Sequence, residues 1–174
     1  MTTLLYSHPV CLEHDAGDQH PERPDRLRAV TTALSAEGFQ ALVRFDAPRC
    51  DISQIERVHT QSHVANIFAT VPASGHARID GDTAMSPQSG EAALRSAGAV
   101  VAAVDAVLGG QASNAFCIGR PPGHHAEPAR AMGFCLFNNI AIGARQAQLA
   151  EGVRRVAVID FDVHHGNGTQ AAFY

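Results

Sequence analysis

The stretch that most constrains the fold lies near residue 160, where an apolar run leads directly into acidic and histidine residues. Residues 155 to 159 read Arg-Val-Ala-Val-Ile, which predicts a parallel strand covered on both faces. Asp160, Asp162, His164 and Asn167 follow at once. Because side chains alternate along an extended chain, the first three should point to one side. Two carboxylates and an imidazole, with no Lys or Arg in the motif, are costly to bury without a cation, so we expect a metal site.

A second polar motif follows another predicted strand and reads Arg-Pro-Pro-Gly-His-His from residue 120 to residue 125. Its prolines and glycine allow a tight bend that holds His124 and His125 together. An imidazole that acts as acid or base needs its other ring nitrogen held by an oxygen acceptor, and Asp160 and Asn167 can provide one. Ligand sites of parallel sheets lie at the carboxyl ends of the strands, so we expect the two motifs to meet.

The order of the predicted elements favours an α/β fold, an open parallel sheet with helices on both faces. Strands are expected at residues 3–6, 42–45, 114–119 and 155–161, and helices at 20–38, 51–57, 62–71, 89–108 and 139–150. Residues 73–87 are expected to form a turn-rich loop. With 174 residues and 45% hydrophobic content, the chain can bury the core of one domain, which we place at 1–174.

Composition excludes several classes of function. The net charge is −4 and the 13 Lys and Arg are scattered, so no nucleic-acid surface is expected. The most apolar stretch, 92–108, contains Arg95 and Asp105, which predicts a core helix and no membrane span. Four widely spaced cysteines are expected to be reduced thiols. No secretory signal is visible, so a cytoplasmic location is the default expectation.

Together these motifs resemble the zinc-dependent histone deacetylases and acetylpolyamine amidohydrolases, which share an arginase-like α/β fold. The resemblance covers nearly the whole chain and rests on five segments: His20-Pro21-Glu22-Arg23-Pro24-Asp25-Arg26-Leu27, Asp80-Gly81-Asp82-Thr83, His124-His125, Met132-Gly133-Phe134-Cys135 and residues 160–170. Asn167 and the His-Pro-Glu-Arg-Pro signature resemble the class II branch. The resemblance implies hydrolysis of acetyl-lysine, with Zn²⁺ as the cofactor and K⁺ as a structural ion.

The resemblance implies a zinc site that these residues form only in part. Asp162 and His164 would ligate Zn²⁺, but the family's third ligand, an Asp from a later strand, and its oxyanion-stabilising Tyr have no counterpart by Tyr174. Because a catalytic zinc normally has three protein ligands and a water, weak or absent zinc binding is expected. Asp160, Asp162 and the His164 carbonyl would form part of the potassium site.

The imidazole pair would carry the proton transfers. The resemblance implies that His125 takes a proton from water and that His124 is hydrogen-bonded to Asp160. Asn167 would orient His125. His165 should turn away from the metal and serve in packing.

Other matching residues would handle the substrate and the product. Gly133 and Phe134 would line a narrow tunnel for the acyl-lysine stem, and Asp82 would hold the substrate backbone at the rim. Arg26, with Arg23 as the alternative, resembles a residue beneath the site near an acetate exit.

Several alternatives stay open. The chain is either the amino-terminal part of a longer enzyme, with its sheet unfinished on the carboxyl-terminal side, or a truncated product that needs a partner chain, such as a second copy, or is inactive. It could instead recognise acetyl-lysine without hydrolysis. An acetylpolyamine is the other substrate class, although Asp18 to Pro21 lacks an insertion that would narrow the entrance. A two-manganese ureohydrolase is disfavoured, since the run from His164 to Asn167 offers no second carboxylate.

Overall fold

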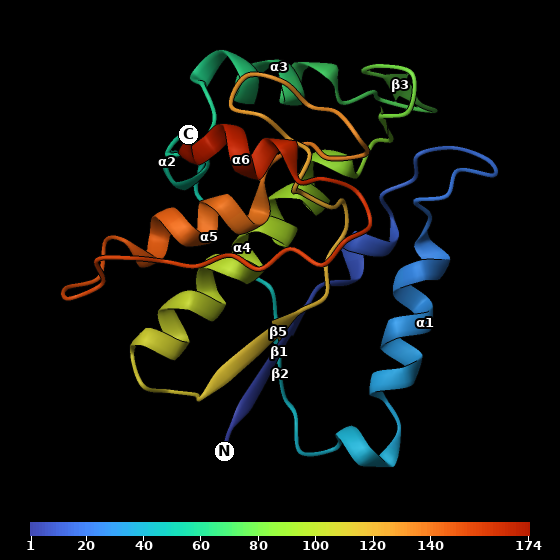
Figure 1. Ribbon diagram of the computed structural model, residues 1–174. Coiled ribbons are helices and arrows are strands. Elements are labelled where there is room, and N and C mark those ends of the chain that lie inside the picture. The colour runs from blue at the N-terminus through green and yellow to red at the C-terminus, as the bar shows by residue number, and fades with distance from the viewer.

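Strand β1 (Thr3–Ser7) is the centre of a three-stranded parallel sheet in a computed structural model that describes residues 1–174. It pairs with β2 (Val43–Asp46) on one side and with β5 (Asn114–Cys117) on the other, in the order β2-β1-β5 (Figure 1). All three lie at positions that the apolar pattern predicts for strands. The expected parallel α/β sheet is therefore confirmed.

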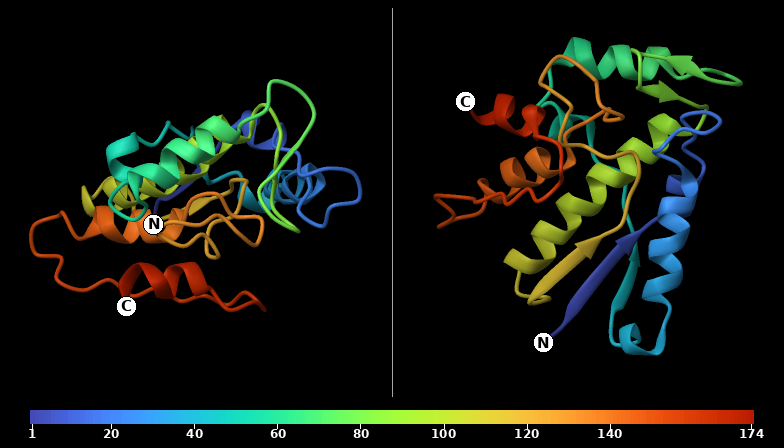
Figure 2. Two further views of the ribbon diagram at one scale, coloured as in Figure 1. Left: turned by 90° about the horizontal axis from the view of Figure 1, so that it is seen from above. Right: turned by 45° about the vertical axis from the view of Figure 1, so that its right-hand side comes forward.

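Helices connect and cover these strands (Figures 1 and 2). In chain order the other elements are η1 (Pro9–Leu12), α1 (Pro24–Leu34), η2 (Glu37–Phe39), α2 (Ile52–Ile55), α3 (Gln61–Thr70), β3 (Ala77–Arg78), β4 (Ala84–Met85), α4 (Ser89–Leu108), α5 (Asn139–Ala147) and α6 (Asn167–Phe173). Helix α4 has the predicted bounds. The predicted loop at 73–87 contains the short antiparallel hairpin β3-β4, and α6 was not predicted.

Both faces of β1 are covered, which explains why its three central residues, Leu4, Leu5 and Tyr6, are all large and buried. Leu5 packs in a cluster with Leu27 and Leu34 of α1. On the opposite face, Leu4 and Tyr6 pack against a row of alanines in α4, namely Ala99, Ala103 and Ala106. Small side chains on α4 let the helix lie close to the sheet. The prediction of helices on both faces is confirmed for this central strand.

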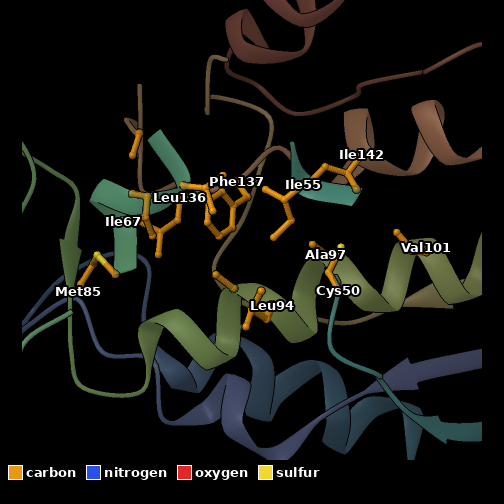
Figure 3. Close-up of a cluster of buried hydrophobic side chains, with 13 residues drawn as sticks. Cys50, Ile55, Ile67, Met85, Leu94, Ala97, Val101, Leu136, Phe137 and Ile142 are labelled. Atoms are coloured by element: carbon orange, nitrogen blue, oxygen red, sulfur yellow. The ribbon is translucent and has the colours of Figure 1, made fainter. Parts of the chain in front are cut away.

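The largest cluster of buried side chains lies on the other side of α4. Figure 3 shows Leu136 and Phe137, from the loop before α5, above α4 and between Ile67 of α3 and Ile142 of α5. The buried stripe of α4 confirms that the apolar stretch is a core helix. No helix of the structure has the length and apolar character that crossing a membrane requires. All four cysteines are free thiols, as expected.

The strand predicted at residues 155–161 is not formed, so this prediction is wrong. These residues form no ladder with another strand, and Figures 1 and 2 show them as an irregular segment running alongside α5. Ile159 and Phe161 are 87% and 96% exposed. The β-branched residues favour an extended conformation of this segment. A β-strand also needs a neighbouring strand whose backbone groups can pair with it, and none within residues 1–174 does so.

Gly98 marks the closest approach of α4 to the chain between β2 and α2. A Cβ atom at this position would lie 2.0 Å from the Pro48 carbonyl oxygen and 2.7 Å from the Cys50 nitrogen. The same Cys50 N–H donates to the Leu94 carbonyl of α4 at 3.0 Å, so this backbone segment is fixed and cannot withdraw.

We therefore expect Gly98→Ala to lower the free energy of unfolding by about 3 kcal/mol, because a methyl group would be forced against backbone. Gly38→Ala is the matched control, since nothing lies within 4 Å of a Cβ there. Its effect should stay below about 0.5 kcal/mol. Urea unfolding of the two variants checks the prediction, and equal effects would contradict it.

His59 links the stability of the fold to pH. Its buried ring donates from Nδ1 to the Glu127 carbonyl at 3.0 Å and accepts from the Asn138 N–H at Nε2 at 2.8 Å, so the folded chain requires the neutral ring. Burial is the main cause that lowers the pKa of His59 from 6.5 to about 4, and the neighbouring His63 adds to it.

As the pH falls from about 6.5 to about 4, the unfolded chain takes up a proton at His59 and the folded chain does not. The contribution of His59 to the free energy of unfolding is therefore fully present above about pH 6.5. It falls by about 2 to 3 kcal/mol as the pH drops to about 4. His59→Gln keeps one donor and one acceptor but cannot titrate. Urea unfolding at about pH 7.5 and about pH 4.5 should show the advantage of the native chain over the variant shrinking by this amount. A pH-independent difference would refute the prediction.

Candidate active site

The two polar motifs meet at the carboxyl end of the sheet. The loop after β5 carries His124 and His125, and the segment from residue 160 into α6 lies against it. Their contact is fixed by the backbone, because the Thr169 N–H donates to the His124 carbonyl at 3.1 Å. A pocket of about 300 Å³ opens between them and is lined by Pro21, Glu22, Arg26, Asp82, Pro122, His124, His125, Gly133, Phe134, Asp162 and His164.

His124 forms a dyad with Asp160. Nδ1 of the imidazole lies 2.8 Å from Asp160 Oδ2, and because a carboxylate only accepts, the ring donates. This hydrogen bond is the main cause that holds the pKa of Asp160 below its usual value. With its proton on Nδ1, a neutral His124 keeps a free lone pair on Nε2.

His125 forms a similar dyad with Asn167, the first residue of α6. Nδ1 of His125 lies 2.7 Å from Asn167 Oδ1, and the amide nitrogen of Asn167 donates to Glu127 Oε1 at 2.8 Å. The rings of His124 and His125 have centroids 4.1 Å apart. Two imidazoles thus stand side by side in the pocket wall, each held at Nδ1 by a different type of acceptor.

Asp162 and His164 also line the pocket, but they reach it by a different backbone path from the one predicted. The chain bends after residue 160, since Asp160 Oδ1 accepts from the Asp162 N–H at 3.1 Å and Asp162 Oδ1 accepts from the His164 N–H at 2.8 Å. Two such turns, and not the alternation of a strand, place these side chains. Asp160 itself lines a neighbouring pocket beside residues 158–162 and is engaged with His124.

Asp162 and His164 bring a carboxylate oxygen and an imidazole nitrogen together through a hydrogen bond that a shared metal ion would have to replace. Asp162 Oδ1 lies 3.0 Å from His164 Nδ1, and both side chains are accessible, 49% and 69% exposed. The hydrogen bonds from the His164 backbone and ring lower the pKa of Asp162, so the carboxylate is available as an anion. Carboxylate oxygen and imidazole nitrogen are ordinary zinc ligands, so these two donors fit the ion. No third His, Cys, Asp or Glu of residues 1–174 joins them.

The rim of the pocket has a constrained backbone. Gly133 and Phe134 both have positive φ angles, +56° and +70°, and a Cβ on Gly133 would strike the His125 ring. The strained conformation of Phe134 is stabilised by its N–H, which donates to the buried Thr83 Oγ1 at 3.1 Å. Thr83 donates in turn to Asp82 Oδ1 at 3.1 Å.

His20 ties this rim to the loop before α1. Its Nε2 donates to the Asp82 carbonyl at 3.0 Å, its Nδ1 accepts from the Glu22 N–H at 3.1 Å, and its ring meets the Phe134 ring edge-on at 4.7 Å. Sequence reasoning assigned no role to His20 or Thr83. Their position in the sequence could have indicated a role. His20 lies in the same segment as Arg26, and Thr83 follows Asp82.

The floor of the pocket contains a buried ion pair between Glu22 and Arg120. The guanidinium binds both carboxylate oxygens at 2.5 Å and also donates to the Cys11 and His14 carbonyls. Burial alone would raise the pKa of Glu22, but hydrogen bonding and the charges of His14 and Arg120 outweigh it and lower this pKa to about 2. Arg26 lies 3.7 Å from the same carboxylate, whereas Arg23 pairs with Asp25 at the surface.

The predicted site residues therefore sort into two groups. The structure brings His124, His125, Asp82, Gly133, Phe134, Asp162, His164 and Arg26 to one pocket, with Asp160 and Asn167 directly behind the imidazoles. His165 is not among the lining residues and bonds Gln170 Oε1 at 2.6 Å. The pocket thus sets two imidazoles beside a carboxylate and a third imidazole, which are the types of group that transfer protons and bind metal ions.

Comparison with known proteins identifies the family. The model of the histone deacetylase domain matches residues 20–174. A histone deacetylase-like amidohydrolase of Pseudomonas aeruginosa is 39% identical over 99% of this chain and 50% of its own length. A probable deacetylase of Methanothermobacter thermautotrophicus is 43% identical over 98% of this chain and 50% of its own. This chain thus spans about half the length of these relatives.

A crystal structure of the HDA15 HD domain superposes with a TM-score of 0.92 at 36% identity, covering 99% of this chain and 50% of that one. Its likeness confirms the deacetylase-like α/β fold, including the arrangement of the loops that carry the pocket. Fold, site and sequence comparison agree, and the chain belongs to the histone deacetylase family.

Proposed function

We propose that this protein takes part in the zinc-dependent hydrolysis of acetyl amides, with acetyl-lysine in proteins or peptides as the substrate. The observation that carries the proposal is the convergence of two imidazoles, each held at Nδ1, with the side chains of Asp162 and His164 in one pocket. General acid–base groups beside metal donors are what amide hydrolysis requires.

The imidazoles would handle the protons. Since Asn167 Oδ1 accepts from Nδ1 of His125, the neutral ring presents a free Nε2 that can take a proton from water. His124 is placed to deliver a proton to the departing amine, and the carboxylate of Asp160 stabilises the imidazolium form that this step uses.

Asp162 and His164 would hold the metal together with a third donor from outside residues 1–174. When bound, zinc polarises the acyl carbonyl and lowers the pKa of water to roughly 7. The potassium site at Asp160, Asp162 and the His164 carbonyl remains a prediction from the family resemblance.

The substrate would enter between Phe134 and the imidazoles. Gly133 and Phe134 provide an apolar wall for an aliphatic stem, and Asp82 stands where a peptide backbone could be bound. Arg26, whose guanidinium lies 3.7 Å from the Glu22 carboxylate, would meet acetate leaving the site. An acetylpolyamine has the same amide and stem but lacks the peptide backbone, so Asp82 is the residue that would separate the two classes.

A second candidate is recognition of acetyl-lysine without hydrolysis. The specific observation in its favour is that only two metal donors converge within residues 1–174. A pocket without a firmly held metal could still bind the stem and the acetyl group through the same wall.

Zinc binding tests the assignment of the metal donors. We expect His164→Ala and Asp162→Ala to weaken zinc binding by at least about tenfold, since even the loss of a residue that only supports a metal ligand costs about 10- to 100-fold. His165→Ala is the matched control and should leave the affinity unchanged, because its ring bonds Gln170. Calorimetric zinc titration of the purified chain checks this, and equal losses in His164→Ala and His165→Ala would remove His164 from the site.

Acetate release distinguishes the two candidate functions. In a protein that also supplies the third metal donor, acetate should be released from an acetyl-lysine peptide when zinc is present, and His125→Ala should lower kcat by about 10²- to 10⁴-fold at unchanged zinc content. Acetate is measured directly, with N-acetylputrescine as the comparison substrate. Peptide binding without any acetate release would support the non-catalytic alternative, and near-native turnover in His125→Ala would overturn the role of His125.

A further inference from the structure

Asn167 and Asp160 each bond Nδ1 of an imidazole, but only Asp160 fixes by itself which ring nitrogen carries the proton. A carboxylate offers only acceptors, so Asp160 dictates the proton on His124 Nδ1. An amide offers an acceptor at one atom and donors at the other. If the Asn167 side chain were rotated by half a turn, its nitrogen would face His125 and would require an unprotonated Nδ1. The proton would then sit on Nε2, and His125 could not accept one from water.

The neighbours of Asn167 Nδ2 determine which way the amide is oriented. Nδ2 lies 2.8 Å from Glu127 Oε1, 3.5 Å from the His125 carbonyl oxygen and 3.4 Å from the Met132 sulfur. Every one of these neighbours is an acceptor, and the carboxylate of Glu127 is the strongest. Only the amide nitrogen can face them, so Oδ1 must face His125.

Glu127 is held in place by its own backbone. Its N–H donates to the Arg130 carbonyl at 2.9 Å, and its carbonyl accepts both from the Arg130 N–H and from the buried His59 ring. Its carboxylate forms no ion pair with any Arg, Lys or His. The half-buried side chain thus has Asn167 as its only hydrogen-bonding partner.

We propose that Glu127 is a positioning residue that locks the Asn167 amide and, through it, holds His125 in the tautomer with its proton on Nδ1. With Glu127 holding its amide, Asn167 would fix the tautomer of His125, as Asp160 fixes that of His124 without a further residue. Its consequence for catalysis rests on the proposed function, whereas the tautomer of His125 follows from the hydrogen bonds alone.

The tautomer is measured in the metal-free chain from the ¹⁵N chemical shifts of the His125 ring at about pH 8.5, well above the ordinary imidazole pKa of about 6.5. The native chain should show the Nδ1–H form. Glu127→Gln has the same shape but can itself either donate or accept, so it should lower the ratio of Nδ1–H to Nε2–H by about tenfold, equivalent to about 1.4 kcal/mol.

A double variant provides the matched comparison. In Asn167→Asp combined with Glu127→Gln, the carboxylate at 167 needs no orienting partner, and replacing Glu127 avoids the repulsion of two carboxylates at a contact that is 2.8 Å in the native chain. The Nδ1–H form should dominate in this double variant as it does in the native chain. A purely structural Glu127 would lower thermal stability in Glu127→Gln without moving the tautomer. An Nε2–H ring in the native chain, an unchanged ratio in Glu127→Gln, or a mixture in the double variant would each overturn the proposal. If Glu127→Gln does not fold, the native chain and the double variant still decide it.

Turnover separates this inference from the proposed function. In a protein that releases acetate, Glu127→Gln should lower kcat by about tenfold with KM unchanged, and combining it with Asn167→Asp should restore most of that loss. Absence of acetate release from a native protein that supplies the third metal donor would contradict the proposed function and leave the tautomer result to stand by itself.

Discussion

The buried ion pair between Glu22 and Arg120 is the contact on which the rest of the site depends. Arg120 immediately precedes the loop that carries both imidazoles, and Glu22 belongs to the loop that carries His20. Removing water from two charges is costly, and the cost is offset only while each remains paired and hydrogen-bonded. The Cys11 and His14 carbonyls complete the arginine's hydrogen bonds. This pair therefore joins the amino-terminal loops to the end of β5 and sets where the pocket can form.

Around that anchor, the site uses carboxylates at several distances from the reacting groups. Asp160 contacts an imidazole directly, whereas Glu127 reaches one only through an amide. Asp162 is accessible and shares its oxygen with the ring of His164. One functional group, the carboxylate, thus orients one imidazole directly and another indirectly, and in the proposed function it also binds the metal. Burial and hydrogen-bonding partners, and not residue identity, distinguish these uses.

The side of the molecule near residues 155–163 contrasts with the closely packed region around α4. Apolar side chains that the sequence marks for burial are exposed there, and a second pocket separates them from α4 and α5. Relatives of this chain are about twice as long. The candidate metal donors Asp162 and His164 lie on this same exposed side. Within residues 1–174, this side offers neither a third metal donor nor a strand that pairs with residues 155–161.

Sequence alone determined the local elements and the chemistry of the two motifs. Strand β1 and helix α4 followed from apolar patterns because their burial is decided by residues close in the chain, and the carboxyl-end rule for parallel sheets placed His124 and His125 near Asp160 and Asn167. Only the tertiary structure decided the pairing of residues 155–161 and the contacts of Glu127. Each of these depends on partners distant in sequence or on the direction of a single side-chain amide, and no local pattern encodes either.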